Sequence, residues 1–244
     1  HRALFVGGVH SDHEQALISY ALTEAYAGTR ISDIKTALEH SLPSVRDGLN
    51  SILHRELPPS PTGTLAWQVM SLRVAQSLQC DVPELDETFQ GVAEAMRQLL
   101  DHYSQDAGKP LPGPSPPGAV ANLAAATLIL QIIGHADEAR VREMGERLHS
   151  TAMGWDARDF ARDPLAIFFL TKTLCYHADE QRTEWLGYMA PVLIDMQQAD
   201  GRWAGPGDQC GDLMATILNL MALESFYGSR LGISNLPARA PSEP

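Results

Sequence analysis

The residues best suited to chemistry in this chain gather in two polar segments. The first segment, residues 10–14, contains His10, Asp12 and His13. Two histidines three positions apart have a spacing that can bind a metal ion. We therefore take His10 and His13 as candidate catalytic residues. A capping segment that carries surface histidines, or a chain end exposed by fragmentation, would give the same pattern.

The second segment is Asp208-Gln-Cys210-Gly-Asp212, next to an apolar run. Zinc needs protein ligands that converge within roughly 2.0–2.3 Å of the metal, and Asp208 and Cys210 are candidate ligands. Asp212 is a candidate catalytic carboxylate. If the helices near residues 12 and 212 start at the same end of the protein, the two segments could face each other. The alternative is a polar loop in which Asp212 only caps the helix.

Helices are the elements that must position these residues. Apolar residues recur at intervals of three and four, whereas the alternation typical of strands is absent over any useful length. The segments expected to be helical are 12–26, 41–53, 64–78, 85–103, 119–133, 137–151, 164–176, 184–198 and 212–227. The sequence therefore predicts an all-α fold.

The expected helices are of two kinds. Those that start near residues 64, 119, 164 and 212 are apolar on most sides, which is expected of helices buried between two layers. Those that start near residues 41, 85, 137 and 184 have one polar face. Stacked helix hairpins with a period of about 50 residues give this alternation, and they form a ring or an arc. We interpret the proline-rich stretch 109–118 as a loop within the series.

The turn between the last two expected helices contains Gln197, Gln198, Gly201 and Trp203. A glutamine amide can hydrogen-bond the backbone groups that lack partners at a helix end, and it can also lie on the Trp203 indole. Gly201 permits the backbone dihedral angles that a tight turn requires. We expect this turn to tie one helix hairpin to the next.

This turn resembles the QW repeat of the prenyltransferase and squalene-cyclase superfamily. Two further segments, Gln15 to Tyr26 and Gly63 to Ala75, look most like bacterial members of uncertain activity. The resemblance implies an α/α toroid, a complete or partial ring of helix hairpins, as a single domain over residues 1–234. We expect the tail at 235–244 to be disordered. These motifs are specific for the fold and unspecific for function.

The catalytic signatures of the enzymes in this superfamily are missing from the sequence. A class II terpene cyclase uses an Asp-x-Asp-Asp cluster to donate the initiating proton, and no such cluster occurs. A protein prenyltransferase holds zinc with Asp, Cys and His, and the position of that His holds Ala215. A complement-type thioester domain needs Cys-Gly-Glu-Gln, whereas this chain has Cys210-Gly-Asp212. The resemblance implies the fold without this chemistry, and we expect no cofactor.

Aromatic residues on the expected helices could line a central apolar pocket suited to a prenyl or other lipid chain. These residues are Tyr20, Trp67, Phe168, Phe169 and Phe226. Ordinary packing between two helix layers would select the same residue types. The pocket is the feature on which an enzymatic function would depend.

Charge and composition limit the classes of partner. The formal net charge is −12, from 30 acidic and 18 basic residues, which argues against nucleic acid and against anionic membrane surfaces. No apolar run in the sequence is long enough to cross a bilayer. The three cysteines are far apart and predict no disulfide framework. Because the chain begins at His1, we expect it to be processed or part of a longer protein.

These observations lead to two hypotheses about function. The first is a non-catalytic module that binds another protein or an apolar ligand such as an isoprenoid. The second is a divergent isoprenoid enzyme, a terpene cyclase or prenyltransferase-like protein, with its site near His10, His13 and Asp212. Metal content, co-purified prenyl lipid and turnover would distinguish the two.

Overall fold

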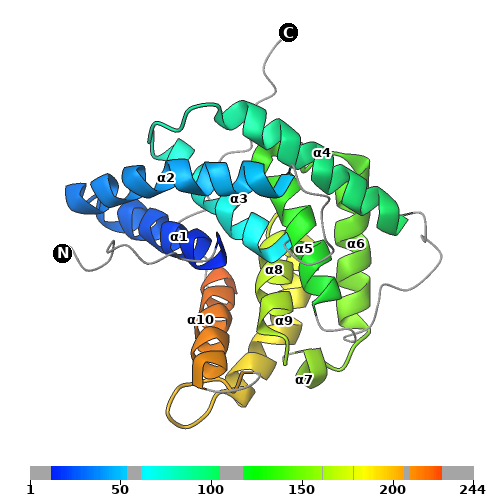
Figure 1. Cartoon of the computed structure of the whole chain (residues 1–244). Helices are drawn as coiled ribbons and strands as arrows, with labels where there is room; N and C mark the ends of the chain where they lie inside the picture. Colours follow the sequence, from blue (N-terminus) through cyan, green and yellow to red (C-terminus); the bar gives the residue numbers. More distant parts are fainter. Residues whose placement is uncertain are drawn as a thin grey trace. The chain divides into compact units, whose positions relative to one another are not determined.

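The computed structural model describes residues 12–53, 62–104, 118–160, 162–177, 179–205 and 209–226 (Figure 1). Helices account for most of these residues, and no strand occurs among them. The all-α prediction is therefore confirmed for the described part of the chain.

The helices belong to two compact units, His1–Gly91 and Val92–Pro244, called here the first and the second unit. The ring of a toroid and the single domain over residues 1–234 stay predictions. The predicted tail at 235–244 lies outside the described residues.

The first unit is built on α1 (Asp12–Thr29), which packs against both α2 (Ser32–Leu53) and α3 (Thr62–Ser77). α3 is buried without interruption from Leu65 to Leu72, as predicted for a helix that is apolar on most sides. α2 instead buries a single stripe whose members recur every three or four residues. This stripe consists of Leu38, Ser41, Leu42, Val45, Leu49 and Ile52.

The start of α2 differs from the prediction. The helix begins at Ser32 rather than Ser41 and continues through Pro43. Proline removes one helical hydrogen bond, but Glu39, whose carbonyl is left without that donor, is exposed, so water can satisfy it. The buried Ser41 hydroxyl donates to the Leu38 carbonyl at 2.8 Å and accepts from Ser19 at 3.2 Å. Ser41 is thus a packing residue between α1 and α2, and the predicted boundary is wrong.

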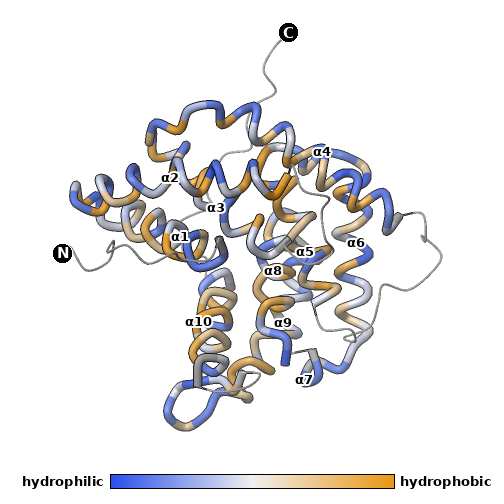
Figure 2. Tube along the Cα trace, in the orientation of Figure 1, coloured by the Kyte–Doolittle hydropathy of each residue, from blue (hydrophilic) through white to orange (hydrophobic). Residues whose placement is uncertain are grey.

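In the second unit, α8 (Pro164–Leu174) is the central helix. It packs against both α5 (Ala119–Leu130) and α10 (Gln209–Phe226) (Figure 1). Hydropathy colouring shows long apolar stretches in α5 and α8 (Figure 2). The whole stretch from Ala166 to Thr171 is buried, because apolar neighbours surround α8.

The remaining helices of the second unit contact α8 or its neighbours. α6 (Ala139–Met153) and α9 (Asp179–Met196) pack against α8, and the short α7 (Ala157–Phe160) contacts both α6 and α9. α8 begins at Pro164, as predicted. Asp163 Oδ1 accepts a hydrogen bond from Ala166 N at 3.0 Å, and Pro164 stands in the first turn.

α4 (Leu85–Ser104) is amphipathic, as predicted. Its buried stripe contains Leu85, Phe89, Val92, Met96 and Leu100. α5 continues into a π-helical turn, η2 (Gln131–His135), which the sequence did not predict. Gly134 in this turn has φ +100°, in the left-handed region that glycine adopts without steric cost. The turn leads the chain into α6.

α10 departs from the prediction in two ways. It begins at Gln209, so Asp212 lies inside its first turns and the prediction that Asp212 is the N-cap is wrong. Its side chains Leu213, Ile217 and Leu220 are 62%, 43% and 46% exposed. The prediction that this helix is buried on most sides is therefore wrong for one face.

Candidate interaction surface on α10

A tight turn connects α9 to α10. Gly201 N donates to the Gln198 carbonyl at 2.9 Å, and Gln198 N donates to the Arg202 carbonyl at 2.8 Å. Gly201 has φ +86°, which a residue with a side chain adopts only with strain. The Gln197 amide donates to the Gly201 carbonyl at 2.8 Å. This glutamine therefore braces the turn itself rather than the end of α9.

The Trp203 side chain occupies the end of α9 instead. The indole is buried, and its Nε1 donates to the Leu193 carbonyl at 2.7 Å. Leu193 is in the last turn of α9, where carbonyls lack helical partners. The backbone N–H of Trp203 donates to Thr216 Oγ1 on α10 at 3.1 Å. One residue thus holds the two helices together.

Asp212, a candidate catalytic carboxylate, has structural partners. Its Oδ1 accepts a hydrogen bond from Gly205 N at 2.8 Å, and its Oδ2 lies 3.6 Å from Arg202 Nη1. Glycine is required at 205 because a Cβ there would collide with the backbone of Gly211. The carboxylate therefore holds the incoming loop against the first turns of α10.

These bonds fix the rotation of α10 about its axis. Asp212 and Thr216 lie one turn apart on the face that meets the loop. The buried face carries Ala215, Leu218, Asn219 and Ala222. Successive helical residues are about 100° apart, so Leu213, Ile217 and Leu220 share a third face about 60° wide. We call these three side chains the α10 stripe.

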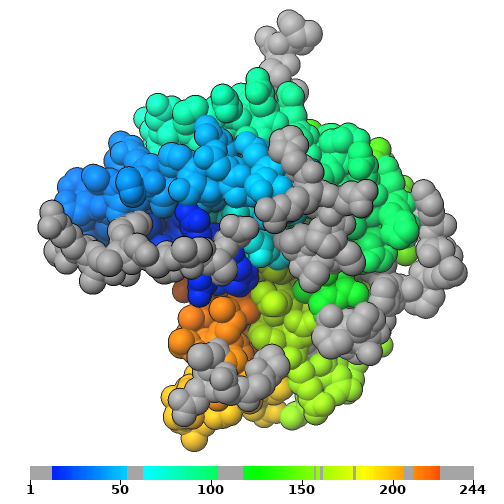
Figure 3. Space-filling view, viewed as in Figure 1, coloured from blue at the N-terminus to red at the C-terminus, as the bar shows by residue number. Residues whose placement is uncertain are grey.

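The α10 stripe is a concentration of exposed apolar surface, and α10 reaches the molecular surface in the view of Figure 3. The other large apolar side chains with substantial exposure in the described ranges are Ile31, Leu165 and Ile194. Scattered single residues of this kind are ordinary on protein surfaces, whereas three on one helix face are informative.

Only some of the other candidate catalytic and metal-binding residues lie within the described part of the chain. His13 is exposed, and its Nδ1 lies 3.1 Å from Thr64 Oγ1, linking α1 to α3 in the first unit. His10 and Asp208 lie outside the described residues, as does the side chain of Cys210. Among the side chains that the structure describes, no group of three or more His, Cys, Asp or Glu is placed to hold a metal ion. The catalytic and metal candidates stay predictions.

The candidate pocket residues are divided between the two units. Tyr20 and Trp67 pack together in the first unit with ring centroids 5.0 Å apart. Phe168 and Phe169 make an edge contact at 5.1 Å in the second unit. All four are buried, with exposures of 6% or less. The side chain of Phe226 lies outside the described residues, and a pocket formed by all five stays a prediction.

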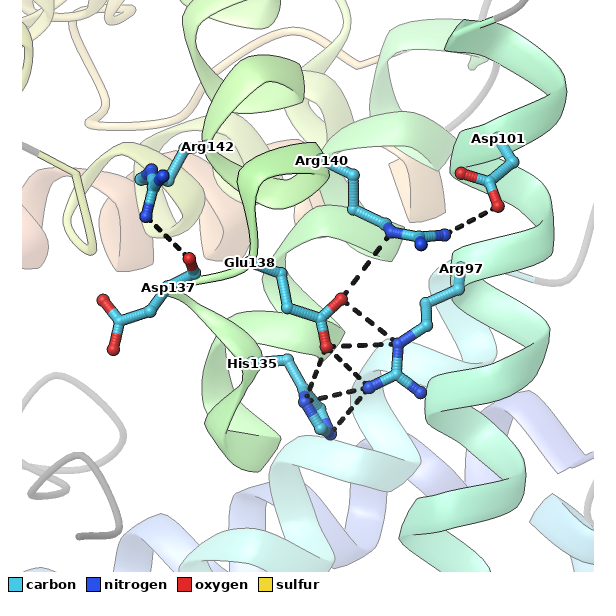
Figure 4. A network of polar contacts seen from close by, with 7 residues as sticks. All are labelled: Arg97, Asp101, His135, Asp137, Glu138, Arg140 and Arg142. Carbon is cyan, nitrogen blue, oxygen red and sulfur yellow. Dashed lines mark hydrogen bonds and ion pairs between the residues drawn. The ribbon is translucent and has the colours of Figure 1, made fainter. Parts of the chain in front are cut away.

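The sequence analysis missed a polar network that joins α4 to the turn before α6 (Figure 4). Arg97 Nη2 lies 2.6 Å from Glu138 Oε1 and 3.0 Å from His135 Nδ1. Arg140 adds an ion pair with Asp101 at 2.6 Å. Arg97 and Glu138 are 41 positions apart, so no local pattern could have revealed the pair.

The network sets the charges of its members. Hydrogen bonding from Arg97 lowers the pKa of Glu138. Burial, followed by the charge of Arg97, lowers the pKa of His135. At neutral pH the carboxylate is therefore ionised and the imidazole neutral, so the ring can accept a hydrogen bond from Arg97. Because these groups satisfy one another, the network is a structural clamp.

A second feature missed in the sequence is a notch over Gly145 of α6. The ring of His177, in the turn after α8, fills it so closely that a Cβ on Gly145 would collide with the ring. Gln131 Nε2 lies 3.1 Å from His177 Nε2, and burial lowers the pKa of His177. Glycine at this position allows the end of α8 to close on α6.

Comparisons with protein-family models, with curated proteins and with solved structures find no match to this chain. Its function must therefore be argued from its own residues. No helix in the described ranges combines the length and the apolar character needed to pass through a bilayer.

Proposed function

We propose that this chain is a non-catalytic module of the α/α-toroid type that binds another protein, with the α10 stripe as its contact surface. The observation that carries the proposal is the exposure of Leu213, Ile217 and Leu220 on one face of a firmly held helix. Covering a half-exposed Leu or Ile contributes about 1 kcal/mol, so the stripe favours association by roughly 3 kcal/mol. Clustered exposed apolar side chains are typical of interaction sites.

The helix pattern supports the toroid type. Much of α3, α5 and α8 is buried, whereas α2, α4 and α6 each combine a buried stripe with an exposed face. Stacked helix hairpins have this alternation. The bonds of Trp203 to α9 and α10 add a staple of the kind that the QW resemblance implies.

The shape of the surface favours a protein over a lipid chain. A ridge along a helix accepts a second helix, whereas a small apolar molecule needs a concave pocket. The structural partners of Asp212 and His13 support binding over the isoprenoid-enzyme alternative.

A selection experiment tests the proposal. Fragments of the source organism's proteome are displayed and selected on the purified chain, and the selected fragments are measured against two variants. The stripe variant carries Leu213→Gln, Ile217→Gln and Leu220→Gln. The control variant carries Ser44→Gln and Ser51→Gln at exposed positions of α2.

We expect the selected fragments to bind the wild type and the control variant equally and to lose at least about tenfold in affinity for the stripe variant. The stripe variant should still unfold cooperatively, at a temperature somewhat below that of the wild type, because Ile217 and Leu220 are only 43% and 46% exposed and lose the contacts of their covered atoms. Fragments that bind the stripe variant undiminished, or a selection that enriches nothing, would contradict the proposal.

A further inference from the structure

The charges on α10 indicate what kind of partner its stripe takes. α10 carries Asp212 and Glu224 and contains no Lys or Arg. Glu224 is exposed and lies one turn beyond Leu220 on the same face, so the stripe ends in a carboxylate. Asp212 lies about 100° around the helix from Leu213, on the face that meets the loop, where Arg202 Nη1 is 3.6 Å from its Oδ2. The surface is therefore apolar along its length and acidic where it ends at Glu224.

The spacing of the stripe matches that of a helical partner. From Leu213 to Leu220 the ridge covers two turns, about 10 Å along the axis. Its i, i+4, i+7 positions can pack into the groove between side-chain rows of a second helix. Apolar anchors on that helix would recur at the same spacing.

A second copy of this chain fits the charges poorly. Parallel pairing of two α10 helices would bring the two Glu224 side chains together. Like charges at such contacts are unfavourable, and each chain already has a formal net charge of −12.

We propose that the α10 stripe binds an amphipathic helix of another protein that presents apolar residues at i, i+4 and i+7 with Lys or Arg beside them. This inference rests on the proposed function and adds the partner's secondary structure and charge. The apolar ridge supplies affinity, and a cation opposite Glu224 sets the orientation of the partner and disfavours acidic competitors.

A library of displayed helical peptides tests this inference. Its apolar positions are fixed at i, i+4 and i+7, and its flanking positions vary among Lys, Arg, Glu and Ser. We expect selection on the wild-type chain to enrich Lys and Arg. Glu224→Lys should weaken the enriched peptides roughly threefold, and raised salt should weaken them as well. Glu143→Lys, the same charge reversal at an exposed position of α6, should leave their affinity unchanged.

Enrichment of Glu or Ser at the flanks, enrichment of no peptide, or equal responses to the two charge reversals would overturn the inference. If the selected proteome fragments still lose affinity for the stripe variant, the proposed function stands and only the identity of the partner is wrong. If those fragments bind the stripe variant undiminished, the proposed function fails as well. A dimer of this chain that the stripe variant dissociates would overturn the inference in favour of self-association.

Discussion

α8 and α10 are neighbouring apolar helices in the second unit, and their surroundings differ. α8 contacts α5 as well as α10, and its stretch from Ala166 to Thr171 is buried. α10 packs against α8 and α9, and its remaining face exposes Leu213, Ile217 and Leu220. Similar apolar side chains therefore form a core in one helix and a surface in the other.

The difference shows that the burial of a helix depends on its neighbours as well as on its own residues. α8 has apolar partners around it, so its apolar side chains stabilise the fold. The α10 stripe has no such partner in the described structure, while Thr216 and Asp212 hold the helix in one orientation. An apolar face held in this way is available to another molecule.

The largest expected effect comes from truncating one side chain in each helix. Phe168 of α8 is fully buried, so Phe168→Ala should lower the free energy of unfolding by about 3–5 kcal/mol. Leu213→Ala in α10 should change it by less than about 0.5 kcal/mol, because that side chain is already in water. Denaturant unfolding followed by circular dichroism measures both. Equal losses in the free energy of unfolding would show that Leu213 is buried. The two helices would then not differ in burial.

Packing at the end of α8 gives the next effect. Gly145→Ala should destabilise the protein by about 1–3 kcal/mol, because its Cβ would collide with His177. Gly187→Ala in α9 is the matched control. No heavy atom lies within 4 Å of its added Cβ, and the change should stabilise the helix by about 0.5–1 kcal/mol.

A His177→Ala background should relieve much of the penalty of Gly145→Ala, since the colliding ring is gone. The same denaturant series measures the double variant. Similar effects of the two glycine substitutions, or a penalty unchanged in the His177→Ala background, would mean that the notch does not hold α6 to the turn after α8.

A smaller effect is expected at the turn that orients α10. Trp203→Phe retains most of the buried ring but leaves the Leu193 carbonyl without its donor. Loss of a buried hydrogen bond of this kind should cost about 1–2 kcal/mol. Thermal and denaturant unfolding measure the change. Unaltered stability would mean that the indole N–H does not fasten α10 to α9.

The smallest expected effect is a dependence of stability on pH, which arises in the packed part of the second unit and not at the stripe. Burial lowers the folded-state pKa of both His135 and His177. Below about pH 6.5, the unperturbed histidine pKa, the unfolded chain binds protons that the folded chain does not, so the free energy of unfolding falls as the pH falls toward the folded values.

Replacing both histidines, with His135→Gln and His177→Gln, should flatten this decline between about pH 7 and pH 5. Glu138, whose folded pKa is lowered, loses its stabilising contribution only at more acidic pH. Urea unfolding at a series of pH values gives the slope. An identical slope in the double variant would show that neither ring is held neutral by the fold.

Much of the fold could be predicted because helical periodicity is a local property of the sequence. The amphipathic character of α4 and the start of α8 at Pro164 are predicted correctly. Local signals also misled. The sequence predicts a helix start at Ser41, yet α2 begins at Ser32 and runs through Ser41 and Pro43. Asp212 looks like an N-cap, yet α10 begins at Gln209.

The candidate site could be predicted from the sequence only in part. Gln197, Gly201 and Trp203 are close in sequence, so the turn could be located, but the bond from the indole to Leu193 could not. The exposed stripe could not be foreseen, because the periodicity of α10 carries no information about the neighbour that would cover it. Arg97 and Glu138 lie 41 positions apart, so no local pattern connects them.

Hydrogen–deuterium exchange with and without a selected Lys- or Arg-flanked helical peptide tests the central claim most directly. Binding on the α10 stripe predicts slower exchange in α10 and unchanged exchange in α6. Protection of other helices while α10 exchanges as in the free chain would contradict the assignment of the α10 stripe as the binding surface.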